Sequence, residues 1–333
     1  MDPKPFGPGI YAARLLRATI FDVDNLLDEA LEAGGQRRRG SGIAALDQYM
    51  RASPRRDFVY GAIFGTNMET IERLLRTCKE LAEAIALAFD SGSLVRVAPF
   101  VLERALGEAI MRICYILDAG VPPARTILRM AAYQLESVEG NLRTAEAFGP
   151  SAAAAKARAE EAITEIHAQL YDNGFARAAA KTTPFTASLM FDGQRENLAF
   201  NATDAYKRYL PASAWQWELG SGATHGRGWL LSGLVETVET EALTTTSEAV
   251  MAVAGSALEL ADALANAMAS HTGVDANWFF RKNHLRRRGV TSWSVGGHVD
   301  LAVDHIEYAR RGTNQRSRGA YLGPSFRRPD SES

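Results

Sequence analysis

The chain has 333 residues, of which 47% are hydrophobic and 23% charged, and its formal net charge at pH 7 is −2. These values are ordinary for a globular protein of one large or two medium domains, and they exclude a dedicated nucleic-acid coat protein. The charge is unevenly distributed. Residues 281–333 carry 11 Lys and Arg against 5 Asp and Glu, which leaves 26 of the 37 basic and 34 of the 39 acidic residues before them.

The apolar pattern favours a protein of a reducing compartment. Cys78 and Cys114 both fall on apolar faces of predicted helices, which is typical of buried thiols and not of disulfides. The first residues lack the apolar core of a signal peptide. The most apolar helix, over residues 250–268, is interrupted by Glu259 and Asp262, which indicates a buried helix instead of a membrane span. We therefore expect a cytoplasmic protein without membrane association.

Apolar residues recur at three- and four-residue spacing along most of the chain, which predicts an all-α fold, a multi-helix bundle over residues 1–280. Residues 172–200 lack this period, and we expect them to form an irregular crossing loop. The predicted helices cover residues 10–31, 67–88, 94–118, 122–147, 151–171, 201–209, 227–243 and 247–271.

The periodicity weakens towards the C-terminus. Residues 281–312 are expected to form a basic extension, with a short hairpin around residues 289–299 at the Gly296-Gly297 pair. Residues 313–333 are rich in Gly, Ser, Arg and Pro, a composition that predicts a flexible, disordered tail.

The predicted helix over residues 94–118 is apolar nearly all round, yet it carries Arg104, Glu108 and Arg112. Their four-residue spacing places them on one face. Because an isolated buried charge is costly, they must pair internally or line a water-filled cleft. Two interpretations follow: a buried ion-pair network that fixes the helix register, or a ligand-binding cleft. Arg129 on the next helix could extend either one.

The segment 220–228 holds four glycines together with Ser221 and His225, close to aromatic residues such as Tyr206. It predicts a loop whose backbone N–H groups and imidazole can approach a ligand. An imidazole side chain is suited to general acid or base catalysis, so His225 could have that role, or it could be a helix-capping residue. The segment matches neither a P-loop nor a dinucleotide-binding fingerprint.

A basic cluster directly follows the aromatic residues Trp278 to Phe280. Electrostatics beside aromatic stacking surfaces suit RNA or single-stranded DNA, although an amphipathic helix edge would look the same. The candidate nucleic-acid-binding residues are Arg281, Lys282, Arg286, Arg287 and Arg288.

Several of these positions together carry a family resemblance. They are Arg104-Ala-Leu-Gly-Glu108, Tyr115-Ile-Leu-Asp118, Arg129, Tyr206, and Ser221 to His225-Gly226. The pattern resembles a group of uncharacterised helical proteins of actinobacteria, which are distantly similar to the HEPN superfamily. That superfamily consists of helical bundles, several of which are metal-independent ribonucleases in toxin or defence systems. Their nuclease motif has an arginine four to six residues before a histidine, and no histidine of this chain has one.

Three functions fit these features. The first is a helical binding or regulatory module in stress or defence biology, whose ligand-binding cleft is formed by Arg104, Glu108, Arg112, Arg129, Tyr206 and Ser221. The second is a metal-independent, HEPN-like ribonuclease with His225 as its catalytic residue. The third is a structural protein that forms homo-oligomers through the helix over residues 244–271. RNA is the candidate macromolecular partner, and none of the three functions calls for a metal ion or another cofactor.

Overall fold

The computed structural model describes residues 7–90, 97–180, 185–225 and 242–294 of the chain. Within these ranges the protein is all-α except for one small sheet, which confirms the predicted fold class. The elements are α1 (Pro8–Gly35), α2 (Gly42–Met50), α3 (Arg56–Phe58), a π-helical turn (Val59–Gly65), α4 (Thr66–Asp90), α5 (Ala98–Ile116), α6 (Pro123–Ala147), a 3-10 turn (Gly149–Ala152), α7 (Ala153–Asp172), β1 (Ala176–Ala179), β2 (Thr186–Phe191), β3 (Gln194–Asn197), α8 (Ala202–Tyr209), a 3-10 turn (Pro211–Ser213), α9 (Ala214–Thr224), α11 (Ala242–Thr272) and α12 (Asn277–Ser294).

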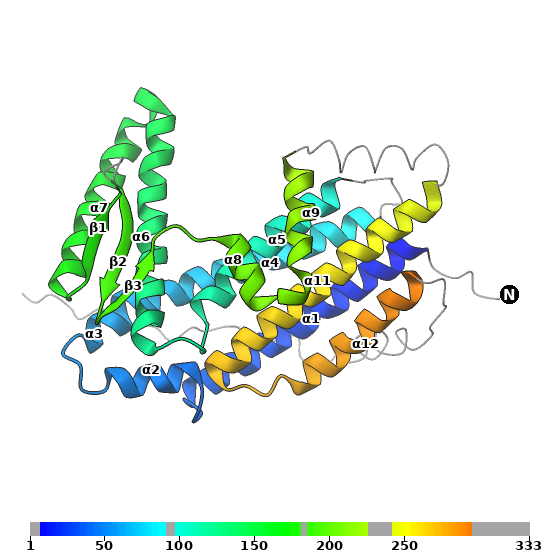
Figure 1. Cartoon of the computed structure of the whole chain (residues 1–333), viewed down its shortest axis with the longest axis horizontal. Helices are drawn as coiled ribbons and strands as arrows, with labels where there is room; N and C mark the ends of the chain where they lie inside the picture. Colours follow the sequence, from blue (N-terminus) through cyan, green and yellow to red (C-terminus); the bar gives the residue numbers. More distant parts are fainter. Residues whose placement is uncertain (1–6, 91–96, 181–184, 226–241, 295–333) are drawn as a thin grey trace, which may run out of the picture.

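Four long helices form the centre of the molecule. Helices α1, α4, α5 and α11 pack in a closed ring in which each contacts the next, and they run lengthwise through the molecule in Figure 1. Ile71, Cys78 and Ile85 show why α4 joins this bundle, since they recur on one face and are buried. Cys78 and Cys114 are both buried and free, as the sequence predicts.

The segment predicted as an irregular loop forms a three-stranded antiparallel sheet with the order β1-β2-β3. The turn between β2 and β3 is the two-residue Asp192-Gly193, whose φ angles are 48° and 72°. Positive φ at both positions matches the twist of a hairpin, and Asp-Gly is a preferred sequence for it. The sheet lies beside the α6–α7 hairpin at one end of the molecule (Figure 1), so this end is α/β instead of irregular.

The C-terminal boundary also differs from the prediction. Helix α12 spans Asn277–Ser294 and packs along α11 and α1, so the basic segment from residue 281 begins inside the bundle. Residues 289–294 are helical, which contradicts the predicted hairpin over that part. Residues 295–312 and the tail predicted over 313–333 lie outside the described residues.

Helix α11 contains the one stretch in the described ranges that is long and apolar enough to cross a membrane by length and composition. This stretch is Ala249–Thr272, with a mean hydropathy of 1.3, and 61% of its most apolar window is buried inside the protein. Helix α11 packs on α1, α5 and α12.

Candidate functional site

The side chains of the predicted cleft are spread along α5. Arg104 contacts α9, whereas Arg129 lies over the ring of Tyr115 with 4.2 Å from its Cζ to the ring centroid. Eleven residues of α-helix separate positions 104 and 115, which is about 16 Å along the axis. The structure therefore does not gather these residues in one cleft.

Arg104 forms the contact between α5 and α9. Its Cζ lies 4.5 Å from the ring centroid of Trp217, a cation–π geometry. A Cβ added to Gly220 would stand 2.8 Å from the Cβ of Arg104, so only glycine permits this helix approach. Gly220 thus lies within α9 and allows this helix to pack closely against α5. The prediction that residues 220–224 belong to a loop is therefore wrong, because they are helical.

Tyr206 is a core residue of the same region. It is 1% exposed, and its ring lies 5.2 Å from that of Trp217. Its hydroxyl has no hydrogen-bond partner among the described residues, and burial raises its pKa. A side chain so enclosed is not available to a soluble ligand, so Tyr206 does not line an open cleft.

Arg112 makes a half-exposed ion cluster instead of the predicted buried array. Its guanidinium lies 3.3 Å from carboxylate oxygens of both Glu108 and Glu136, and Glu136 comes from α6. The side chain of Glu108 is 39% exposed. Within the described ranges no ion pair joins Arg104 to Glu108, so the array contains one arginine and two glutamates.

Asp118, just after α5, is the centre of a second and more buried cluster. It accepts hydrogen bonds from Arg129 at 3.0 Å, from the Tyr209 hydroxyl at 2.9 Å and from Arg208 at 2.8 Å. Burial alone would raise the pKa of Asp118, but the hydrogen bonds from Tyr209, Arg129 and the Gly120 backbone, together with the charge of Arg208, outweigh it and lower the pKa. The cluster joins α5, α6 and α8, and a satisfied carboxylate of this kind is a structural feature.

His225 follows the last residue of α9, and its side chain is exposed. Its backbone N–H donates to the carbonyl of Ser221 at 3.0 Å, so the residue ends the helix. It lies five residues beyond Gly220, about 7.5 Å of helical rise from the contact with Arg104. Residues 226–228, the second half of the predicted glycine loop, lie outside the described residues.

Tertiary contacts occupy much of the basic cluster on α12. Lys282 and Arg286 both pair with Asp22 of α1, which is fully buried, and Arg287 lies 3.3 Å from Asp262. Arg281 and Arg288 are exposed. The candidate nucleic-acid-binding set therefore contains two exposed cations, Arg281 and Arg288, while Lys282 and Arg287 are partly exposed.

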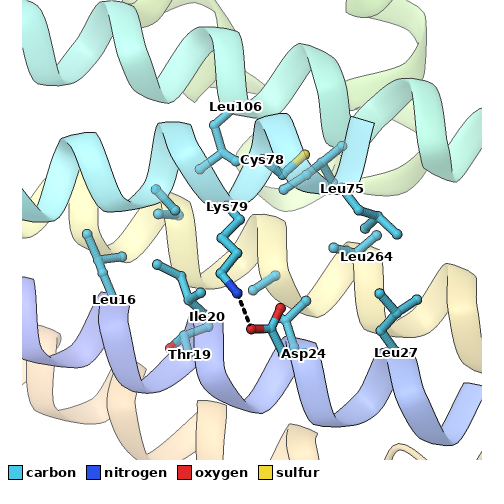
Figure 2. Close-up of a pocket in the computed structure, with 15 residues that line it drawn as sticks. Leu16, Thr19, Ile20, Asp24, Leu27, Leu75, Cys78, Lys79, Leu106 and Leu264 are labelled. Atoms are coloured by element: carbon cyan, nitrogen blue, oxygen red, sulfur yellow. Dashed lines mark hydrogen bonds and ion pairs between the residues drawn. The ribbon is translucent and has the colours of Figure 1, made fainter. Parts of the chain in front are cut away.

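An apolar pocket lies between the four central helices. It has about 70 Å³ of space, and its walls come from α1, α4, α5 and α11. The lining is almost entirely apolar, including Leu16, Leu106, Leu264 and the alanines 82, 257 and 261. Figure 2 shows the ion pair of Lys79 and Asp24, which links α4 to α1 beside the pocket. Both side chains of this pair are about half exposed, so it lies at the solvent side of the pocket.

The sequence does not indicate this pocket, because each wall residue is an ordinary helix former. The only sequence signal is the recurrence of alanine on the inner faces of α4 and α11. Among the described residues no three His, Cys, Asp or Glu side chains are grouped so that they could hold a metal ion. No protein-family model matches the chain, and comparisons with curated proteins and with solved structures also give no match.

Proposed function

We propose that the protein is a binding protein for a small apolar ligand, held in the pocket between α1, α4, α5 and α11. The observation that carries this proposal is unfilled apolar space inside the central bundle, because protein interiors are otherwise packed to the density of organic crystals. A concave, mostly apolar site with a few polar groups at its edge is typical of small-molecule binding. This proposal agrees with the binding module expected from the sequence, but it assigns the ligand to this apolar pocket and not to the polar cleft.

The size of the pocket limits the ligand. One water requires roughly 10–15 Å³ of such space, and the pocket offers about 70 Å³. It therefore accommodates about five to seven heavy atoms, the size of a short alkyl chain or one aromatic ring. We expect a polar group of the ligand to face Lys79 and Asp24, which pair at the solvent side of the pocket.

Titration with 1-hexanol, followed by calorimetry and by thermal unfolding, tests the proposal. Wild-type protein should bind with saturation, and Tm should rise, because a ligand that binds only the folded state stabilises it by about 2.7 kcal/mol at 100 times Kd. Ala261→Leu, which fills the pocket from α11, should abolish binding. Ala154→Leu makes the same change on the exposed surface of α7 and should bind like wild type.

An equal response of Ala261→Leu and Ala154→Leu would show that hexanol acts elsewhere. If wild-type protein gives no saturable heat and no rise in Tm, the proposal fails outright.

A second proposal is polyanion binding at the outer face of α12. His284, Arg287 and Arg288 line an open groove together with Glu259, Thr291 and Ser292, and Arg281 is exposed on the same helix. Anisotropy of labelled single-stranded RNA over a salt series tests it. The double change Arg281→Ser and Arg288→Ser should lower the slope of log affinity against log salt by about 1.4, since each phosphate contact on a single strand contributes about 0.7. An unchanged slope would reject this face as the site.

The ribonuclease hypothesis stays a prediction. Arg112 and Arg129 are engaged in ion clusters at the other end of α5 from the α9 contact, so they do not support a phosphate-binding role beside His225.

A further inference from the structure

Glu103 is a buried carboxyl group without a cation. It lies on α5, is 3% exposed, and its carboxyl oxygen is within hydrogen-bond distance of the Ser256 hydroxyl on α11. Among the described residues no Lys, Arg or His lies within ion-pair distance of it. An ionised carboxylate in such a place carries a large desolvation penalty.

The hydrogen bonds around Ser256 identify the protonation state of Glu103. The Gln216 amide nitrogen on α9 lies 3.0 Å from a carboxylate oxygen of Glu259, so this nitrogen donates and the amide orientation is fixed. The Gln216 carbonyl oxygen then faces the Ser256 hydroxyl at 2.7 Å. A carbonyl oxygen only accepts, so Ser256 must donate its single proton to Gln216.

The second contact of Ser256 then requires a proton from Glu103. With its own proton given to Gln216, the Ser256 oxygen can only accept from the carboxyl group of Glu103. An ionised Glu103 would leave two oxygens in contact with no proton between them. The observed contacts are thus all satisfied only when Glu103 is a neutral acid.

The groups that surround Glu103 do not change this conclusion. On α5 itself, the guanidinium of Arg104 lies over Trp217. From α8, Tyr206 faces Glu103 as an uncharged phenol whose pKa burial raises. Helix α11 contributes Glu259, bound to Gln216 and to Ser213, and the charged residue of α9, Glu218, is exposed. Other charged or titratable residues on α5 and on the helices packed against it also have partners. Glu108 on α5 and Glu136 on α6 pair with Arg112, Lys79 and Glu83 on α4 pair with residues of α1, and Cys78 on α4 lies near Cys114.

We propose that Glu103 is the protonated member of a pH-sensitive latch that holds α9 against α5 and α11 through Ser256 and Gln216. Loss of the Glu103 proton replaces a donated hydrogen bond with repulsion between oxygens. The carboxylate is then stabilised by water, which it reaches when α9 moves away. The latch acts on α9 and is independent of the ligand proposed for the central pocket.

The electrostatics place the transition near neutral pH. Burial raises the pKa of Glu103 from 4.5 to about 7. Because the closed form binds the proton more tightly, closure weakens as pH rises above 4.5 and the loss is complete above about 7. Between pH 6 and pH 8 the opening equilibrium should increase about tenfold.

Hydrogen exchange measured by mass spectrometry on peptides of α9, corrected for the intrinsic pH dependence of exchange, tests the latch. Wild-type protein should show the increase in opening over residues 214–224 between pH 6 and pH 8. Glu103→Gln donates an amide N–H to Ser256 at every pH, so its α9 should remain equally protected at both values. Glu108→Gln is the matched control on the same helix, half-exposed and paired with Arg112, and should behave like wild type.

Thermal unfolding of the same proteins supplies a second measurement that does not require resolved α9 peptides. Wild type and Glu108→Gln should lose stability from pH 6 to pH 8 relative to Glu103→Gln. Equal pH dependence in wild type and Glu103→Gln, by both methods, would overturn the latch. So would a pH-dependent opening in which α9 is not involved.

Discussion

Asp22 provides a sharp test of how α12 is attached to the bundle. Its carboxylate is fully buried in α1 and pairs with Arg286, whose side chain is 4% exposed, and with Lys282 at 2.9 Å. Asp22→Asn keeps the shape of the side chain and removes its charge. Arg286 would then remain buried without a counter-charge, and breaking a buried pair in this way costs about 3–5 kcal/mol.

Asp24 serves as the control on the same helix. It pairs with Lys79, but both side chains are about half exposed, and such pairs contribute about 0–1 kcal/mol. In urea unfolding followed by circular dichroism, Asp22→Asn should lower the free energy of unfolding several-fold more than Asp24→Asn. Equal losses would refute the reasoning, because they would mean that water reaches Arg286.

A double change separates a lost attraction from a stranded charge. Replacing both partners of a buried pair by neutral groups is often close to neutral in stability. Asp22→Asn with Arg286→Met should therefore recover most of the loss. If the double variant is no more stable than Asp22→Asn alone, the cost lies in packing and not in the uncompensated guanidinium.

Three further predictions concern other positions. Glu108→Ala should cost at most about 1 kcal/mol in urea unfolding, because Glu108 is half-exposed and Arg112 keeps Glu136. Gly107→Ala should lower Tm markedly, since the new Cβ would stand 1.6 Å from the Tyr206 hydroxyl oxygen, and adding Tyr206→Phe should restore part of the loss. His271 is buried, and burial lowers its pKa from 6.5 to about 4, so its contribution to stability is full above pH 6.5 and is lost as pH falls through 4. The loss of about 3 kcal/mol should be absent in His271→Gln, measured by urea unfolding at pH 7 and pH 4.

Helices with an apolar face could be predicted from sequence. The periodic residues of α4 and the Pro122-Pro123 start of α6 gave bounds within a few residues of those in the structure. These signals are local, because an amphipathic face and a proline at the first turn act within the helix that contains them.

Helix α12 was not predicted as part of the bundle because of its buried polar residues. Its inner face carries Asn283 and Arg286 together with Phe279 and Val290, so it has no continuous apolar stripe. These polar groups are stabilised by partners elsewhere in the chain, Asp22 on α1 and Asp262 on α11. The Asp22–Arg286 pair spans 264 residues of sequence and the Asp262–Asn283 pair spans 21, so neither leaves a pattern within α12 itself.

The small sheet has one local signal in the sequence, the turn between β2 and β3. Asp192-Gly193 is a hairpin turn sequence, but the residues that follow it, Gln194–Asn197, are all polar, and β2 buries Ser188 and Leu189 in succession, which breaks the alternation expected of a strand. The strands β1 and β3 have four residues each, too few to show a period.

The candidate site was the part that sequence located least well, and the reason is physical. Arginines and carboxylates on apolar helices suggest a ligand, yet in this fold Arg129 and Asp118 bind each other and thereby join helices. The sequence pattern around a charged residue is the same whether that residue binds a ligand or a neighbouring helix. No single residue type marks a pocket in a sequence. The pocket forms where Ala82 of α4 and Ala261 of α11 line the same space, and each of these alanines alone indicates only a helix.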